Sequence, residues 1–284
     1  MAFEIRAREF KETDPDRADQ LYREGLRAFP ESMELLGNYA FFLPHLRDDQ
    51  DGAEKRYRQA LNVDPDAAKN LGNYANLLTG VRGDHDEAEK HYRRALEADS
   101  GNVAALGNYA NFLMEIRGNS DGAKEHFKRA LDIESDEANI LGNYASLLRR
   151  FPSDPDGVEE QYRRALELAP NHSGNLGNYA NFLKHVRGDN DGAEEHYKRS
   201  LEADPNYAIG LGNYAGFLLG LGRLDERMDL LDRAISAARF TKVTGLQVEC
   251  WFYLYANGLA SRCDEALVEL KRVLVIGDRS GAGD

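Results

Sequence analysis

The sequence is short of cysteine, of long apolar runs and of positive charge. Its 284 residues include only two cysteines, Cys250 and Cys263. Two thiols do not make a disulfide framework, so we expect buried free cysteines. No segment has an apolar run of the length that a signal peptide or a membrane-spanning helix needs. We therefore expect a cytoplasmic protein that does not bind membranes.

Negative charge dominates the composition. The chain has 49 Asp and Glu residues against 36 Lys and Arg residues, for a formal net charge of −13. Nucleic-acid binding draws its affinity from Lys and Arg, so this balance argues against a nucleic-acid partner. It favours a neutral or basic protein or peptide partner instead.

Sequence signatures of catalysis are also missing. The chain has no nucleophile elbow, phosphate-binding loop or paired-carboxylate motif. We therefore expect no enzyme activity, no catalytic residue and no cofactor. His91, His126 and His196 recur at matching places, but equivalent residues on helices about 8–10 Å apart cannot converge on one zinc ion at about 2 Å. We expect these histidines at the surface or at the edge of a binding groove, and no metal site.

A strict repeat runs through most of the chain. The pentapeptide Leu-Gly-Asn-Tyr-Ala returns every 35 residues, beginning at Leu36, Leu71, Leu106, Leu141, Leu176 and Leu211. Such a period indicates a solenoid, in which small units bury their apolar faces by stacking on one another. The array exposes a long regular surface, which suits binding better than catalysis.

Each unit has the pattern of two amphipathic helices. In the third copy, Leu106 and Tyr109 begin one helical stripe, and Ala123, Phe127 and Ala130 form a second. Gly-Asp or Gly-Asn pairs mark the turn between the two helices. An aspartate three residues before a glutamate predicts a capping box at the start of the second helix in four copies, at Asp51, Asp86, Asp156 and Asp191.

These units resemble the tetratricopeptide repeat. The resemblance rests on the small and aromatic residues of the second helix, such as Ala88, Tyr92 and Ala95, on the following proline, such as Pro205, and on the Tyr-Ala pair of the first helix. It implies an all-α fold, namely a right-handed α-solenoid of stacked antiparallel helix pairs, whose first helices line a concave groove. The family's usual period is one residue shorter. We expect the extra residue in the turn near Arg82, Arg117 and Arg187, and expect it to be missing from the sixth copy.

A second family, the pentatricopeptide repeats, has this period natively and reads single-stranded RNA. The negative charge and the Asp-Pro ending of the units argue against that family. RNA binding is kept as a minor alternative.

We expect one continuous domain. Its predicted parts are a leading helix pair in residues 1–35, six repeats in residues 36–240, a divergent capping pair in residues 241–276 and a disordered tail in residues 277–284. Trp251 and Tyr255 of the capping pair either cover the sixth repeat or form a contact patch for a partner or a second copy.

An asparagine ladder is the candidate binding site. We count positions from the leucine of the pentapeptide as position 0, so that positions 2, 5 and 9 point away from the apolar stripe. An amide both donates and accepts hydrogen bonds, which suits the backbone of an extended peptide. The ladder resembles the one in the repeats of O-linked N-acetylglucosamine transferase, and this implies a sequence-tolerant grip. Its residues are Asn38, Asn73, Asn108, Asn143, Asn178 and Asn213 at position 2, and Asn76, Asn111 and Asn181 at position 5.

The alternative interpretation of the ladder is architectural. The asparagines would then bond carbonyls of a neighbouring unit, and the pentapeptide glycines would let adjacent helices pack closely. Selectivity, if the ladder binds a partner, is expected where the copies differ, around Glu115, Arg149, Arg150, Lys184 and His185. The carboxylate clamp of chaperone-binding repeats needs paired cations, and Lys69 alone does not form one. We therefore expect no tight binding to acidic C-terminal tails.

The sequence thus predicts a protein-interaction scaffold whose asparagine-lined groove takes an extended segment of another protein. The leading alternative is a self-assembling or regulatory module that acts through its terminal helices.

Overall fold

The computed structural model describes residues 2–10, 13–46, 49–150, 154–241 and Val268. Within these residues every regular element is a helix, as the sequence predicts. The chain divides into two compact units, Met1–Ser135 and Asp136–Asp284.

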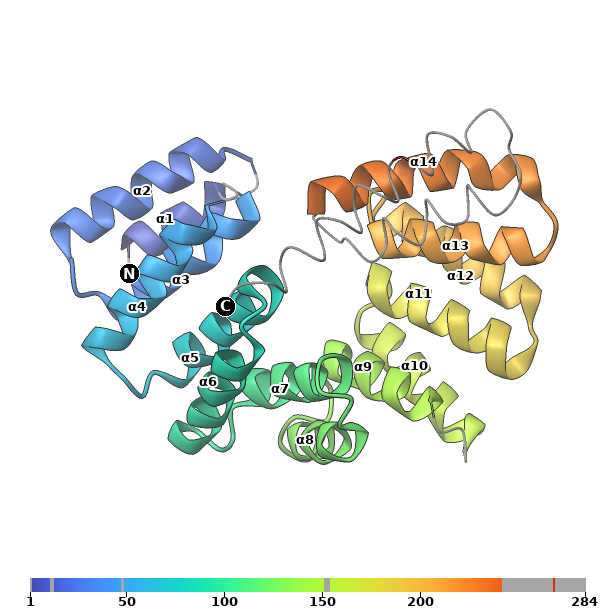
Figure 1. Ribbon diagram of the computed structural model, residues 1–284, viewed down its shortest axis with the longest axis horizontal. Helices are drawn as coiled ribbons and strands as arrows, with labels where there is room; N and C mark the ends of the chain where they lie inside the picture. Colours follow the sequence, from blue (N-terminus) through green and yellow to red (C-terminus); the bar gives the residue numbers. More distant parts are fainter. Residues whose placement is uncertain (1, 11–12, 47–48, 151–153, 242–267, 269–284) are drawn as a thin grey trace. The chain divides into compact units, whose positions relative to one another are not determined.

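The first unit is built from consecutive helix pairs (Figure 1). In each pair we call the earlier helix the first helix and the later one the second helix. The pairs are α1 (Ala2–Phe10) with α2 (Pro15–Ala28), α3 (Met33–Leu46) with α4 (Gln50–Val63), α5 (Ala68–Leu77) with α6 (His85–Ala98), and α7 (Val103–Glu115) with α8 (Ser120–Ile133). A short π-helical turn, η1 (Leu78–Arg82), extends α5.

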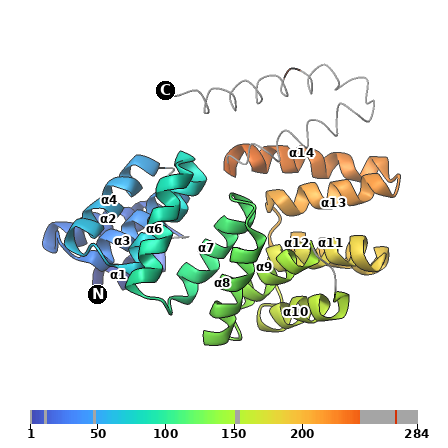
Figure 2. The same cartoon turned by 60° about the horizontal axis from the view of Figure 1, so that its bottom comes forward.

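The second unit repeats this arrangement, and its helix pairs lie side by side in both views (Figures 1 and 2). The pairs are α9 (Ala138–Arg149) with α10 (Pro155–Leu168), α11 (Ser173–Phe182) with α12 (Asn190–Ala203), and α13 (Ala208–Gly220) with α14 (Leu224–Thr241). The π-helical turn η2 (Leu183–Arg187) extends α11. The fold is therefore an all-α helical-repeat solenoid, as predicted.

The second helices begin two residues earlier than the sequence predicted. Asp49 caps α4, because its side chain accepts a hydrogen bond from the backbone amide of Gly52 at 2.8 Å. Equivalent caps are Asp84, Asn119, Asp154 and Asp189. The predicted capping boxes are wrong, since Asp51, Asp86, Asp156 and Asp191 lie inside the first turn. Each of these four copies has two aspartates close together, and the true cap is the one with non-helical dihedral angles.

The extra residue of the period lies near the predicted arginines. A π turn makes i→i+5 hydrogen bonds and so holds one residue more than an α turn, and η1 and η2 end at Arg82 and Arg187. In α7 the amide of Arg117 donates to the carbonyl of Phe112, five residues back, at 3.3 Å. Gly83, Gly118 and Gly188 follow with φ of 66°, 63° and 68° and end these helices in the left-handed region. In the sixth copy α13 ends at Gly220, and the turn glycine, Gly222, comes one residue earlier in the repeat, so the extra residue is missing.

Stacked tyrosines form the core where one pair meets the next. Tyr92 of α6 stacks on the pentapeptide Tyr109 of α7, with ring centroids 5.5 Å apart. The same stack recurs at Tyr57–Tyr74, Tyr162–Tyr179 and Tyr197–Tyr214. Such pairs contribute about 0.5–1.5 kcal/mol beyond the area they bury. The tyrosine of the pentapeptide therefore serves packing between pairs.

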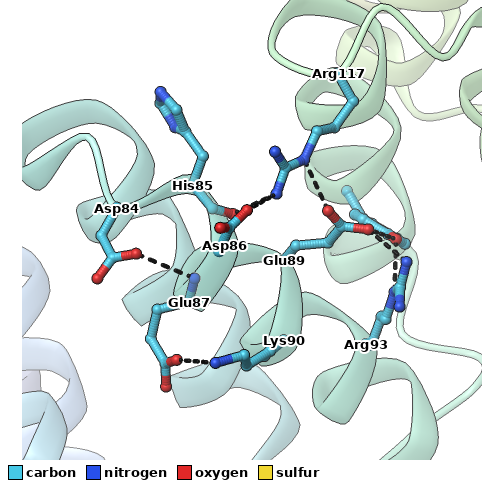
Figure 3. A network of polar contacts seen from close by, with 9 residues as sticks. Asp84, His85, Asp86, Glu87, Glu89, Lys90, Arg93 and Arg117 are labelled. Atoms are coloured by element: carbon cyan, nitrogen blue, oxygen red, sulfur yellow. Dashed lines mark hydrogen bonds and ion pairs between the residues drawn. The ribbon is translucent and has the colours of Figure 1, made fainter. Parts of the chain in front are cut away.

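A carboxylate on the second helix also forms hydrogen bonds with side chains of the next pair (Figure 3). Glu89 of α6 accepts a hydrogen bond from Arg117 Nε at 2.7 Å and another from the Tyr109 hydroxyl at 3.2 Å. It also pairs with Arg93 of its own helix at 2.5 Å, while Asp86 accepts from Arg117 Nη2 at 2.6 Å. We call this arrangement the carboxylate network. It recurs around Glu54, Glu159 and Glu194.

The network changes the titration of Glu194. Hydrogen bonds from Arg223 and Lys198 lower the pKa of this carboxyl to about 2. The matching residue of α8, the last helix of the first unit, is Lys124 rather than a glutamate. The carboxylate network is thus a feature of the pairs within each unit.

Several predictions from the sequence lie outside the described residues. They concern the capping pair after Thr241 with Trp251 and Tyr255, the thiols Cys250 and Cys263, and the tail in residues 277–284. The boundaries of the predicted domain parts stay a prediction.

Candidate functional site: an amide stripe on the first helices

Positions 2 and 5 of the repeats lie on one accessible side of the first helices, because residues three apart share a helix face. The asparagine at position 2 is half-buried in all six copies, and position 5 is half-buried or exposed. We call the asparagines at these two positions the amide stripe. The first unit carries its part on α3, α5 and α7, and the second unit on α9, α11 and α13.

Most position 2 amides have no hydrogen-bond partner within the described residues. In the first copy, Asn38 donates to Glu4 of α1 at 2.7 Å and accepts from Lys69 at 3.4 Å. The other five make no side-chain hydrogen bond within the described residues, and they are Asn73, Asn108, Asn143, Asn178 and Asn213. Both the donor and the acceptor of each amide therefore remain available.

The asparagine at position 5 accepts a hydrogen bond from a tyrosine on the second helix of the same pair in two copies. The Tyr92 hydroxyl donates to Asn76 Oδ1 at 2.5 Å, and the Tyr197 hydroxyl donates to Asn181 Oδ1 at 2.7 Å. Burial raises the pKa of Tyr92 to about 12, so its hydroxyl stays protonated and remains a donor. These bonds leave each amide nitrogen free to donate outward. Asn111 has no such tyrosine, because the matching residue of α8 is Phe127.

The pentapeptide glycines serve the packing of neighbouring first helices in two copies. A Cβ on Gly37 would lie 2.1 Å from Asn70 Oδ1, and one on Gly142 would lie 2.0 Å from Asn175 Oδ1. Asn175 is 2% exposed, and its amide donates to the Ala138 carbonyl at 3.0 Å. The architectural interpretation therefore holds for these two glycines and for Asn175, which the ladder does not include.

The predicted specificity residues lie where the first helices end, at positions 8 and 9. Glu115 of α7 and Arg150 of α9 are exposed, whereas Arg149 is half-buried beside Tyr162. Lys184 is half-buried as well, with Nζ 5.6 Å from the centroid of the Phe217 ring.

Three of these residues form a group in the second unit. Burial lowers the pKa of Lys184 and of His185. The positive charges of Lys184 and Arg149 lower the pKa of His185 further, so the three side chains lie close enough to interact. We call Arg149, Lys184 and His185 the cation group. Glu115 belongs to the other unit.

Two family models match the chain, and both describe the tetratricopeptide repeat. One matches residues 82–147 and the other matches residues 48–103 and 186–240, so that together they span more than half of the chain. The chain contains tetratricopeptide repeats. None of the curated proteins matches it in sequence.

Solved tetratricopeptide structures are similar to it in fold. A tetratricopeptide repeat protein from Parabacteroides merdae is 15% identical with a TM-score of 0.59, over 88% of this chain and 97% of that one. The pilF protein of Pseudomonas aeruginosa is 19% identical with a TM-score of 0.56, over 78% and 96%. A chain of the APC/C hetero-tetramer Cut9–Hcn1 is 14% identical with a TM-score of 0.69, over 87% of this chain and 48% of that one. At such identities the likeness concerns the fold alone.

The recurrent histidines of these tetratricopeptide repeats pack against tyrosines. His91 is 7% exposed and its ring lies 4.9 Å from that of Tyr74, so its predicted surface position is wrong. His126 and His196 are half-buried. Their rings lie 4.9 Å from Tyr109 and 4.8 Å from Tyr179, the pentapeptide tyrosines of the same helix pairs. Within the described residues, no group of three or more His, Cys, Asp or Glu side chains could hold a metal ion. No described helix is long and apolar enough to cross a membrane.

Sequence reasoning missed two features of the repeats. The carboxylate network has a sequence signal, since an arginine precedes the turn glycine in each of three copies, at Arg82, Arg117 and Arg187, 28 residues after the glutamate that it binds. The buried Asn70 and Asn175 have a weaker signal, because both directly precede the pentapeptide leucine.

Proposed function

We propose that this chain is a protein-interaction scaffold whose amide stripe binds an extended segment of another protein. Tetratricopeptide repeats generally act as non-catalytic scaffolds that bind proteins or peptides. The observation that carries the proposal is the hydrogen bonding of position 2. In the part of the chain that the structure describes, five half-buried asparagines on an accessible face make no side-chain hydrogen bond. In contrast, the tyrosine next to each of four of them, and the buried Asn175, do make side-chain hydrogen bonds.

The chemistry of the stripe suits a peptide backbone. A backbone offers one donor and one acceptor per residue, and an asparagine amide can bond both. Each such bond contributes about 0.5–1.5 kcal/mol net, so that affinity requires several copies of the position. Because the amide is the same in each copy, the stripe itself reads little sequence. Selectivity then comes from positions 8 and 9, around Glu115, Arg149, Arg150, Lys184 and His185.

The charge of the whole chain sets the type of partner. At −13 it attracts a neutral or basic protein more than an acidic one, and it repels nucleic acid. We place this binding in the cytoplasm and assign it no catalytic step.

An affinity capture from native lysate, read by mass spectrometry, tests the proposal. The variant Asn73→Ala, Asn108→Ala, Asn178→Ala removes three open amides. The matched control Asn62→Ala, Asn171→Ala, Asn206→Ala removes three exposed amides outside the stripe. Partners held by the wild type and by the control, but lost by the stripe variant, are the expected result.

Equal capture by all three proteins would contradict the proposal. It would move the function to the second helices or to the ends of the chain, as in the alternative of a self-assembling module. Light scattering after gel filtration then shows whether the chain associates with itself.

A further inference from the structure

The cation group lacks carboxylate partners within the described residues. Elsewhere in the described residues, the repeated arginines of the carboxylate network form ion pairs, at Arg58, Arg82, Arg93, Arg117, Arg163 and Arg187. In contrast, Lys184 and His185 make no ion pair within the described residues. Arg149 makes none either, and its Nε is buried without a hydrogen-bond partner. Half-buried positive charge without a counter-charge is unfavourable in the free protein.

The fold does not require cations at this position. Position 8 is Thr79 in η1, whose hydroxyl donates to the Ala75 carbonyl at 2.9 Å, and Met114 in α7, which is 6% exposed. Both residues occupy the equivalent place in the first unit without positive charge. Arg149 and Lys184 therefore need an explanation other than packing.

The cation group lies next to the amide stripe of the second unit. Arg149 is beside Tyr162, which bonds Ser146 at position 5 of α9 at 3.1 Å. Lys184 and His185 follow Asn181 on the same first helix, within one turn. If Asn143 and Asn178 bind the backbone of a peptide, the side chains of that peptide therefore lie close to the cation group.

We propose that the amide stripe of the second unit selects an acidic segment, with two carboxylate side chains of the bound protein pairing with Arg149 and Lys184. This inference rests on the proposed function. Arg149 lies on α9 and Lys184 lies on η2, which extends the neighbouring first helix α11, and packed helices lie about 8–10 Å apart. Alternate side chains of an extended chain point to the same side about 7 Å apart. Acidic residues two apart in the segment therefore lie on the same side of the bound chain and can each face one cation, even where the partner as a whole is neutral or basic.

A library of random 12-residue peptides displayed on phage tests the inference. The bait proteins are the wild type and the cation variant Arg149→Met, Lys184→Thr, which installs the side chains found at position 8 in the first unit. The charge control Lys55→Thr, Lys128→Met removes two exposed lysines from second helices of the first unit. The stripe variant Asn143→Ala, Asn178→Ala tests the backbone contact.

The wild type and the charge control are expected to enrich Asp or Glu at residues i and i+2. In a fluorescence-anisotropy titration, changing both acids of the best peptide to amides should weaken wild-type binding about ten-fold. For the cation variant the same change should alter binding by less than about two-fold. The thermal unfolding midpoint of the cation variant should stay close to that of the wild type, because relief of the unpaired charge offsets loss of the contact between Lys184 and the Phe217 ring.

Three results would overturn the inference. If the wild type selects peptides without acidic residues, or if the cation variant keeps the preference, the acidic segment is wrong and the scaffold proposal stands. If a single-stranded oligonucleotide binds through Arg149 and Lys184, the group belongs to a nucleic-acid site. If the wild type selects no peptide at all, the proposed function fails as well.

Discussion

The carboxylate network and the amide stripe recur in successive repeats, but they differ in how their polar groups are paired. Around Glu89, both carboxylate oxygens accept hydrogen bonds, from Tyr109 and Arg117, and Arg93 adds an ion pair. At Asn73 and at four equivalent asparagines, no side-chain hydrogen bond is made within the described residues. A repeated residue can therefore hold the repeats together or remain open to a ligand, and only the pairing of its polar atoms distinguishes the two.

The largest stability change is expected from breaking the network. Glu89→Ala leaves the Tyr109 hydroxyl and Arg117 Nε without their acceptor in a partly buried interface, while Arg117 Nη2 keeps its bond to Asp86. We expect a loss of about 2–3 kcal/mol in the free energy of unfolding, measured by urea denaturation. Repeat arrays depart from two-state unfolding, so the midpoint of the affected transition is the quantity to compare.

Glu87→Ala is the matched control for that experiment. Glu87 is on the same helix, and its main ion pair is with the exposed Lys90 at 2.8 Å. Its loss should cost no more than about 0.5 kcal/mol. Equal effects of Glu87→Ala and Glu89→Ala would show that the carboxylate network does not stabilise the contact between pairs.

The pentapeptide glycines provide the next comparison. Gly142→Ala would place a Cβ 2.0 Å from Asn175 Oδ1, whereas in Gly177→Ala the nearest atom, Ser200 Oγ, is 3.7 Å away. We expect Gly142→Ala to destabilise by about 1–3 kcal/mol through overpacking. Gly177→Ala should be neutral or stabilising by up to about 1 kcal/mol, since alanine is the better helix former.

Thermal denaturation of the two glycine variants separates packing from helix propensity. Adding Asn175→Ala to Gly142→Ala should remove the steric part of the loss. If Gly177→Ala destabilises as much as Gly142→Ala, close packing against Asn175 does not explain the glycine of the fourth copy.

Acid should weaken the network at Glu194. Its pKa in the folded protein is lowered to about 2 by Arg223 and Lys198, and an unfolded glutamate titrates near about 4.3. The stabilisation is therefore complete above about pH 4.3 and is lost as the pH falls towards about 2. For this partly exposed network we expect a loss of about 1 kcal/mol, seen as a falling urea midpoint. Glu194→Gln should flatten this dependence, whereas Glu195→Gln, on the exposed side of α12, should leave it as in the wild type.

The smallest stability effect is expected on the amide stripe. Asn178→Ala removes no side-chain hydrogen bond and should change the free energy of unfolding by less than about 0.5 kcal/mol. Asn175→Ala loses the bond to the Ala138 carbonyl in a buried site and should cost about 1–2 kcal/mol. A large loss in Asn178→Ala, measured by thermal denaturation, would mean that the stripe is architectural.

The sequence predicts the parts of this molecule that depend on period alone. The spacing of Leu106 and Tyr109 identifies the buried face of one helix. A helical wheel drawn from the same spacing places Asn108 on the accessible side. It does not predict contacts that depend on how far a side chain reaches into the next pair. Glu89 looked like part of a capping box until Asp84 proved to be the cap, and its true partner is Arg117.

The cation group illustrates the same limit. Arg149 and Lys184 were expected to vary with specificity, but their proximity to one another depends on the packing of α9 against α11. Burial and the absence of a counter-charge are properties of the folded chain, and a helical wheel of a single repeat contains neither.

The most direct test of the account is an NMR titration that follows side-chain amide signals while the selected 12-residue peptide is added. The account predicts shifts for Asn143 and Asn178 at the peptide concentration that saturates binding. The buried Asn175, one turn away on the same helix, should not shift. Shifts confined to the second helices, with Asn143 and Asn178 unchanged, would contradict the claim that the amide stripe is the binding surface.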